Sequence, residues 1–261
     1  CHCSRQSTIC VGSVMSAGTI GWLSAGLSDV PSDDGWVDPG MAARFSGMRF
    51  TKRFTEARLA RWVAKRAVAA TMGLAETHES LRRIVIRNAL DGAPEAFVDE
   101  DPISAVIAMT DRADWAVCAL LDVGGRVGCD LELVEPRSQA FAADYFTATE
   151  QRVVAHATNP DVVANVIWSA KESALKVLRT GLRRDTRTVE VHLDGEDARD
   201  WQPLTVIDNG TAEFTGWWCR FNQFLLTCVT ETPTPPPVSL DDPPALKAAQ
   251  PSHGWLDQPR R

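Results

Sequence analysis

The sequence has no excess of positive charge and no long apolar run. Its 27 lysines and arginines are outnumbered by 34 aspartates and glutamates, which gives a formal net charge of -7. A dedicated nucleic-acid-binding protein normally shows the opposite balance, and the apolar runs are far too short to span a bilayer. We therefore expect no nucleic-acid partner and no membrane insertion. An anionic small ligand would need a local basic patch.

The cysteines also lack a pattern. There are seven, an odd number without a repeating framework, which favours reduced thiols in a cytoplasmic protein. The opening stretch CHCSRQSTIC looks like a metal cluster, but no second ligand pair follows at a finger-like distance. No initiator methionine or secretion signal is visible either. We expect no zinc site there, and we expect residues 1–20 to be a flexible extension.

The rest of the chain alternates between helix and strand patterns, which is typical of the α+β class. Its length suits one large domain or two small halves. Residues 54–74 predict a helix with Thr55 as its N-cap and Gly73 near its end. The stretch from Thr232 to the C-terminus is rich in proline and has almost no apolar periodicity. We expect residues 232–261 to be a disordered tail.

The middle of the chain carries several turn and cap signals. Residues 116–134 predict two strands joined as a hairpin at the glycines 124 and 125. Thr147 and Glu150 stand at capping-box spacing and predict a helix start. A further helix is expected from Pro160, capped by Asn159, to about residue 178. Later strands are expected at 186–193, 204–208 and 224–230.

The strand 126–134 places two carboxylates on one face. Asp130 and Glu132 are two positions apart, so their Cα atoms lie roughly 7 Å apart and their side chains project side by side. Unpaired like charges at that distance repel, so a cation is expected between them, Mg²⁺ most naturally. An exposed polar strand face is the alternative. The opposite face is apolar and consists of Val127, Cys129, Leu131 and Leu133.

Charged residues also interrupt the helix that is expected to start at Pro160. Glu172 and Lys176 are four positions apart and share a face, Lys171 lies beside them, and Trp168 precedes Glu172 by one turn. A surface ion pair is the ordinary explanation. The functional alternative is a third carboxylate for the metal, with lysines for the phosphates that the metal bridges.

Three segments, GCDLELVEPR, YFTATE and WSAKESALK, resemble in order and spacing the signatures of the 4′-phosphopantetheinyl transferases. Those signatures are G-[VI]-D-[IVL]-E, F-[ST]-x-x-E and W-x-x-K-E-[AS]-x-x-K. The resemblance is greatest to the long, pseudo-dimeric (Sfp-type) group and extends over roughly residues 20 to 230. Cys129 replaces the usual branched apolar residue, which a buried strand face tolerates.

The resemblance implies a fold of two similar α+β halves related by a pseudo-twofold. Residues 21–122 would be the coenzyme A-binding half, and residues 123–231 would carry the metal and catalytic motifs. The implied activity of this cytoplasmic monomer is transfer of 4′-phosphopantetheine from coenzyme A to a serine of an apo acyl or peptidyl carrier protein, as in polyketide and nonribosomal peptide synthesis. Adenosine 3′,5′-bisphosphate would be released. A weakened relative that binds carrier proteins without efficient transfer is the alternative.

The same resemblance assigns roles to individual residues. Asp130, Glu132 and Glu172 would ligate Mg²⁺, with Mn²⁺ as the alternative metal. Lys176 would hold the phosphates of coenzyme A, and Lys171 is a second candidate. The base that deprotonates the serine would be Glu172 or a water held by the acidic cluster.

A cationic stripe is expected on the helix at 54–74. Arg58, Arg61 and Lys65 fall at i, i+3 and i+7 of one face, and an acidic protein needs such a patch to bind coenzyme A. A solvated helix face is the alternative. Arg183, Arg184 and the nearby Arg187 form another cluster, explained either by contact with an acidic carrier protein or by a solvated loop.

Two positions depart from the family pattern. Thr110 and Asp111 stand where the family has a Ser/Thr-His pair, whose histidine contacts a coenzyme A phosphate. An aspartate would repel that phosphate, so we expect Asp111 to reduce the preference for the 3′-phosphate. Ala93 stands where some members carry a lysine.

Overall fold

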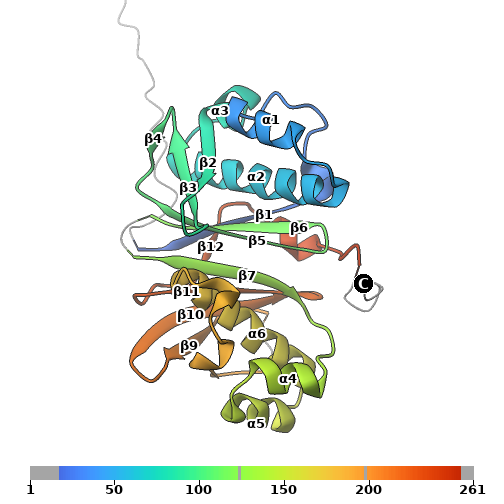
Figure 1. The fold of residues 1–261 in the computed structure, drawn as a ribbon, viewed down its shortest axis with the longest axis vertical. Helices are drawn as coiled ribbons and strands as arrows, with labels where there is room; N and C mark the ends of the chain where they lie inside the picture. Colours follow the sequence, from blue (N-terminus) through green and yellow to red (C-terminus); the bar gives the residue numbers. More distant parts are fainter. Residues whose placement is uncertain (1–17, 123–124, 197–198, 254–261) are drawn as a thin grey trace, which may run out of the picture.

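The computed structural model describes residues 18–122, 125–196 and 199–253 (Figure 1). The cysteines and histidine of the opening stretch, and most of the extension expected over residues 1–20, therefore lie outside the described residues. The first strand, β1 (Ile20–Gly26), already begins at Ile20, which is fully buried. The ordered fold thus starts slightly earlier than the sequence predicted.

The N-terminal half consists of a long helix, α2 (Thr51–Met72), across the outer face of a four-stranded sheet (Figure 1). The strand order is β12 (Val238–Ser239), β1, β6 (Trp115–Leu121) and β5 (Val106–Arg112). Apolar residues of α2 such as Leu59, Val63 and Val68 pack against the sheet, which explains why the helix forms despite its many charges. The other elements of this half are η1 (Leu27–Asp29), α1 (Pro39–Ser46), α3 (His78–Arg83), β2 (Ile84–Asn88), β3 (Pro94–Val98), β4 (Asp101–Pro102), β5 (Val106–Arg112) and β6 (Trp115–Leu121).

The C-terminal half repeats this plan. Helix α6 (Pro160–Val177) lies across the outer face of a five-stranded antiparallel sheet with the order β7-β11-β10-β9-β8. The combination of helices and antiparallel sheets confirms the α+β class. The elements are β7 (Val127–Leu133), α4 (Gln139–Tyr145), α5 (Ala148–His156), η2 (Gly181–Arg183), η3 (Thr186–Thr188), β8 (Val189–Leu193), β9 (Gln202–Asp208), β10 (Ala212–Phe221) and β11 (Phe224–Thr230).

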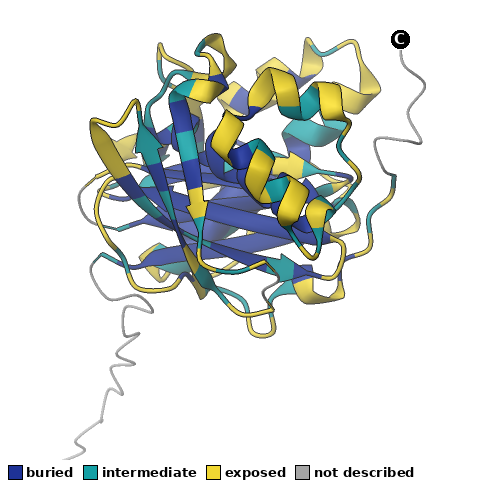
Figure 2. Cartoon of the chain, turned by 90° about the horizontal axis from the view of Figure 1, so that it is seen from below, coloured by how far each residue is buried: buried dark blue, intermediate teal, exposed yellow. Residues whose placement is uncertain are grey.

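The inner faces of the two sheets pack on each other, and Figure 2 shows these central strands as the buried part of the molecule. Trp22 and Val117 of the first sheet share this core with Cys129 and Leu131 of the second. The alternation predicted for β7 is therefore confirmed, because its apolar face points into the core between the sheets. Its other face points toward α6, where the two carboxylates lie.

The predicted hairpin at residues 116–134 is wrong. Strand β6 pairs with β1 and β5, whereas β7 pairs with β11 in the other sheet. The chain thus crosses from one sheet to the other between these two strands. Both strands are buried, and two consecutive apolar runs look the same in sequence whether they pair side by side or stack in neighbouring sheets.

Two of the three predicted helix starts were right, and the third, that of α2, was predicted one turn too late. Helix α5 begins with the predicted capping box of Thr147 and Glu150. Helix α2 begins one turn before the predicted cap Thr55, whose hydroxyl donates instead to the carbonyl of Lys52 at 2.9 Å. Gly73 ends α2 with φ +65°, a left-handed conformation that favours glycine. Pro160 opens α6 as predicted, although the Asn159 side chain makes no capping hydrogen bond.

Residues 232–253 are not the disordered tail that the sequence predicted. Strand β12 (Val238–Ser239) pairs in parallel with β1, and η4 (Ala245–Ala248) buries Leu246 in the core between the sheets. The backbone amide of Leu246 donates to Ser24 Oγ at 3.1 Å. Proline removes helical periodicity, but it does not prevent an extended segment from pairing with an edge strand. The segment therefore completes the N-terminal half.

None of the helices in the described part of the chain has the length and hydrophobicity that a membrane crossing requires.

Candidate active site between the halves

The candidate site lies where β7 passes directly beneath α6. A Cβ atom added to Gly128 would stand 2.0 Å from the carbonyl oxygen of Ser173, so only glycine permits this approach of strand and helix. Ser169 of the same helix donates its hydroxyl to the backbone oxygen of Asp130 at 3.0 Å. The carboxylates of β7 are thereby held against one face of α6.

Asp130 is 7% exposed, and polar side chains of both halves contact its carboxylate. Lys176 Nζ lies 3.0 Å from its Oδ1, and the Thr110 hydroxyl of β5 donates to the same oxygen at 3.2 Å. Thr110 also accepts from the amide of Leu131 at 3.1 Å. Thr110 thus belongs to the site through Asp130, and it fixes the position of β7 relative to β5.

Glu132 is 8% exposed and has three cationic or polar neighbours. Trp168 Nε1 donates to Oε1 at 2.8 Å, while Arg112 Nε and Arg137 Nη2 each lie 3.3 Å from Oε2. Burial, followed by the charge of Asp130, raises the pKa of Glu132, and the two guanidinium groups oppose that rise. The sequence analysis missed both arginines. Arg137 stands within the EPR stretch next to the motif and could have been noticed, whereas nothing in the sequence marked Arg112.

Glu172 completes the acidic cluster. Its burial, then the charge of Asp130, raises its pKa to about 7, while Lys176 opposes the rise and Glu132 adds to it. Glu172 belongs to α6, the helix that packs on β7, and the charges of both β7 carboxylates raise its pKa. Lys176 adds a positive charge to this cluster: it pairs with Asp130 and favours the charged form of Glu172.

The chemistry of this cluster suits a hard divalent cation. All three donors are carboxylates, which Mg²⁺ prefers, and the buried Oδ2 of Asp130 and Oε2 of Glu132 have no hydrogen-bond partner among the described residues. The side chains are not drawn tightly together, however: no three His, Cys, Asp or Glu side chains of the described residues are grouped closely enough to hold a metal ion. The residue types and the unpaired Oδ2 of Asp130 fit the metal, whereas Oε2 of Glu132 faces the guanidinium groups of Arg112 and Arg137. The three carboxylates would have to come closer together to hold one ion.

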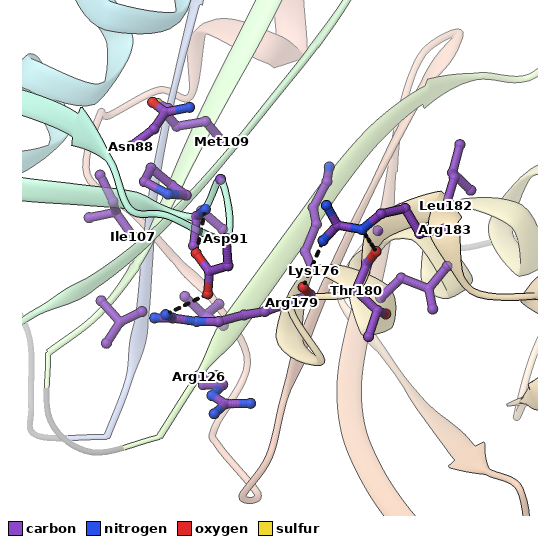
Figure 3. A pocket seen from close by; sticks show the side chains of 18 of the residues that line it. Asn88, Asp91, Ile107, Met109, Arg126, Lys176, Arg179, Thr180, Leu182 and Arg183 are labelled. Atoms are coloured by element: carbon purple, nitrogen blue, oxygen red, sulfur yellow. Dashed lines mark hydrogen bonds and ion pairs between the residues drawn. The ribbon is translucent and has the colours of Figure 1, made fainter.

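A cavity of about 670 Å³ opens beside Lys176, between the halves (Figure 3). Its walls come from the β2–β3 loop, from β5, from the start of β7 and from the end of α6. The volume is suited to a small organic ligand, and the positive lining favours an anionic one. The cationic lining residues are Arg61, Arg126, Lys176, Arg179 and Arg183, and Asp91 is the acidic residue among the described lining residues.

Comparison with known families finds a match for most of the C-terminal half. Its residues match the model of the 4′-phosphopantetheinyl transferase superfamily over positions 126–221. This segment belongs to that superfamily. The resemblance that the motifs predicted is thus confirmed at the level of the superfamily, which implies a transferase that uses coenzyme A as substrate. No curated protein matches the chain.

The transferase segment contains the three carboxylates and Lys176, but the cationic stripe predicted on α2 lies outside it. Of that stripe, only Arg61 lines the cavity. Arg58 pairs with Asp34, and Lys65 is fully buried with its Nζ 3.0 Å from Asp38. Neither Arg58 nor Lys65 lines the cavity, so their positions give no support to the expectation that they bind coenzyme A. Their helix face turns into the N-terminal half because acids distant in sequence neutralise it there.

Asp111 does not line the cavity. It is exposed and borders a separate cavity of about 110 Å³ together with Lys52, Glu56 and His253. Its location therefore gives no support to the expected repulsion of a phosphate in the large cavity. Ala93, the other departure from the family pattern, does line that cavity.

The arginine cluster after α6 is largely committed to internal contacts. Arg184 pairs with Asp208, and Arg187 lies 2.8 Å from Asp185. Arg183 lines the cavity and donates to the carbonyl of Thr180 at 3.2 Å. Arg183 and Arg187 remain exposed, but the aspartate partners of Arg184 and Arg187 reduce the positive charge that the cluster offers to an acidic carrier protein.

Lys171 is structural and does not reach the phosphate site. It is fully buried, its Nζ lies 2.8 Å from Glu150, and it donates to the backbone carbonyls of Thr186 and Val189. The pair ties α5 and α6 to the start of β8. The expectation that Lys171 holds a phosphate is contradicted, because the residue points to the side of α6 away from β7.

Replacing this lysine will cost stability. We expect Lys171→Met to lower the free energy of unfolding by about 3–5 kcal/mol, because Glu150 is left as a buried charge without its partner. Urea denaturation of the single variant and of Lys171→Met combined with Glu150→Gln measures this. The double variant should recover part of the loss. A single-variant loss below about 1 kcal/mol would show that the pair contributes no more to stability than an exposed ion pair does.

Proposed function

We propose that the protein transfers 4′-phosphopantetheine from coenzyme A to a serine of an apo acyl or peptidyl carrier protein and releases adenosine 3′,5′-bisphosphate. One observation carries this proposal: Lys176 joins the two parts of the site. It pairs with Asp130 in the acidic cluster, and it lines the cation-rich cavity. A ligand phosphate in the cavity would therefore lie next to the carboxylates.

The proposed reaction matches these residues. The serine oxygen forms a bond to the phosphorus that carries the pantetheine arm, and the bond from that phosphorus to the bridging pyrophosphate oxygen breaks. The serine proton passes to Glu172 or to a water held by the acidic cluster. Lys176 would hold a phosphate oxygen through the step. Mg²⁺, held by Asp130, Glu132 and Glu172, would supply charge neutralisation of the pyrophosphate.

The cavity supports coenzyme A as the donor. Coenzyme A brings several negative charges, and each charge-assisted contact to a phosphate is worth about 1.5–3 kcal/mol. Arg61 comes from the N-terminal half, whereas Arg126, Arg179 and Arg183 come from the other. Binding between the halves supports assignment of the protein to the long, pseudo-dimeric group, acting as a monomer with a coenzyme A-binding first half.

A second candidate is a relative that binds carrier proteins and transfers weakly. This candidate is supported by the ion pairs of Glu132, whose Oε2 lies 3.3 Å from both Arg112 and Arg137. A metal would have to compete with two guanidinium groups for this oxygen. The two candidates differ in the rate of transfer and agree on the partner.

Intact mass measurement tests the proposal. Several apo acyl and peptidyl carrier proteins are incubated with the protein, coenzyme A and Mg²⁺, and each is compared with its serine-to-alanine variant. A gain of one phosphopantetheine on the serine-containing carriers, abolished by chelation of the metal, is the expected result. Carriers that bind without any gain in mass would favour the second candidate.

A further inference from the structure

An ion pair crosses the cavity from one half to the other. Asp91 belongs to the β2–β3 loop of the N-terminal half, and Arg179 follows the end of α6. Arg179 Nη1 lies 3.0 Å from Asp91 Oδ2, and Figure 3 shows the two side chains pointing toward each other among the lining residues. Both side chains are about one-third exposed, 35% each. The contact is therefore accessible to a ligand that enters the cavity.

Each partner is held in place by its own backbone. Asp91 Oδ1 accepts from the amide of Ala93 at 3.0 Å, so the turn of the loop directs the carboxylate. Arg179 has φ +56°, a left-handed conformation that glycine adopts far more readily. A large side chain at such a position is unfavourable for folding alone, and strained positions of this kind gather at ligand sites.

The Asp91 carboxylate lies where the cationic lining could otherwise hold an anionic group of a ligand. The rest of the charged lining is cationic, and Asp91 is the acid that faces it among the described lining residues. Lys176 is paired with Asp130, and Arg183 donates to backbone carbonyls. Arg126 pairs with Glu231, which does not line the cavity, and Arg61 donates to the neutral amide of Asn88. Arg179 is thus the cation whose charge is balanced from across the cavity by a residue that an entering anion can replace.

We propose that Asp91 and Arg179 form a latch, in which Asp91 occupies on Arg179 the position that a ligand phosphate takes when it binds. Opening the latch frees Arg179 for the phosphate and separates the β2–β3 loop from the end of α6. Asp91 thereby weakens binding of the ligand, and Arg179 strengthens it. That the ligand is coenzyme A rests on the proposed function.

Calorimetric titration of the full chain with coenzyme A tests the latch. Asp91→Asn removes the charge and keeps an acceptor for the Ala93 amide, so we expect coenzyme A to bind about threefold to tenfold more tightly. Arg179→Gln should weaken binding by about tenfold or more. In the Arg179→Gln background, Asp91→Asn should then change the affinity by less than about twofold.

Controls separate the latch from general effects of charge. Asp99→Asn removes another exposed, arginine-paired acid of the same half, and it should leave the affinity unchanged. Pantetheine, which has no phosphate, should bind wild type and Asp91→Asn alike. Asp91→Ser, whose hydroxyl can accept from the same amide, provides a second variant if the asparagine variant folds poorly.

The outcomes distinguish the latch from the proposed function. Unchanged or weaker coenzyme A binding by Asp91→Asn, or an equal gain in the Arg179→Gln background, would overturn the latch. If the affinities change as expected and no carrier protein gains mass, the latch stands and the proposed transfer fails. If carriers gain mass and Asp91→Asn binds as wild type does, the latch alone fails.

Discussion

Glu172→Gln will lower the rate of phosphopantetheine transfer by at least about a hundredfold, the loss typical of removing one electrostatic group from a reaction centre. The carboxylate belongs to the helix that packs on β7, and the charges of Asp130 and Glu132 act on its pKa. Glutamine has nearly the same shape but cannot balance the positive charge of a metal or accept the serine proton. Burial and two like charges already disfavour the ionised form of Glu172, so the variant should be at least as stable as wild type.

The initial rate of mass gain on a carrier protein measures this effect at saturating coenzyme A and Mg²⁺. Glu213→Gln is the matched control, because Glu213 is an exposed glutamate on β10, and its rate should equal that of wild type. Coenzyme A affinity should fall much less than the rate, since the arginines of the cavity remain. A rate within about threefold of wild type would remove Glu172 from the reaction.

Which residues of β7 and α6 share a face could be predicted from the sequence, because those patterns are local; the roles of these residues in binding and catalysis stay predictions. The alternation of β7 determined which face carries Asp130 and Glu132, and helical spacing placed Glu172 and Lys176 together. Both patterns depend on residues within one element, and the structure retains both. The motifs on these two elements also sufficed to identify the superfamily, which the comparison confirms.

The errors arose where partners are distant in sequence. Lys65 and Lys171 looked like ligand-binding cations, but Asp38 and Glu150 bury them in ion pairs over separations of 27 and 21 residues. A lysine on a helix face gives no local sign of such a partner. Likewise, the contact of Asp91 with Arg179 joins residues 88 positions apart, so only the assembled halves bring them together. The wrong hairpin has the same cause, because sheet pairing is not local.

The close approach of β7 to α6 makes Gly128 the most sensitive backbone position of the site. Gly128→Ala will lower the free energy of unfolding by about 3 kcal/mol, at the upper end of overpacking effects, because the added methyl group meets the backbone of Ser173 and not a movable side chain. The strand and the helix must separate to relieve the clash. We expect the remaining folded protein to lose at least about tenfold in transfer rate, since a shift of even 1 Å at a reaction centre has a large effect.

Urea denaturation and the carrier mass assay, both performed on Gly128→Ala and Gly195→Ala, separate this mechanism from the general effect of replacing glycine. A Cβ atom at Gly195 meets nothing within 4 Å, so this control should stay within about 0.5 kcal/mol of wild type and keep its rate. The rate of Gly128→Ala must be measured under conditions where the variant is fully folded, so that it reports the geometry of the site. Because Gly128 carries no functional group, a loss of rate there can arise only through the positions of its neighbours. If Gly128→Ala matches the control in both stability and rate, the contact between β7 and α6 does not position Asp130 beside Glu172, and the carboxylates owe their convergence to the polar contacts of Thr110 and Lys176 instead.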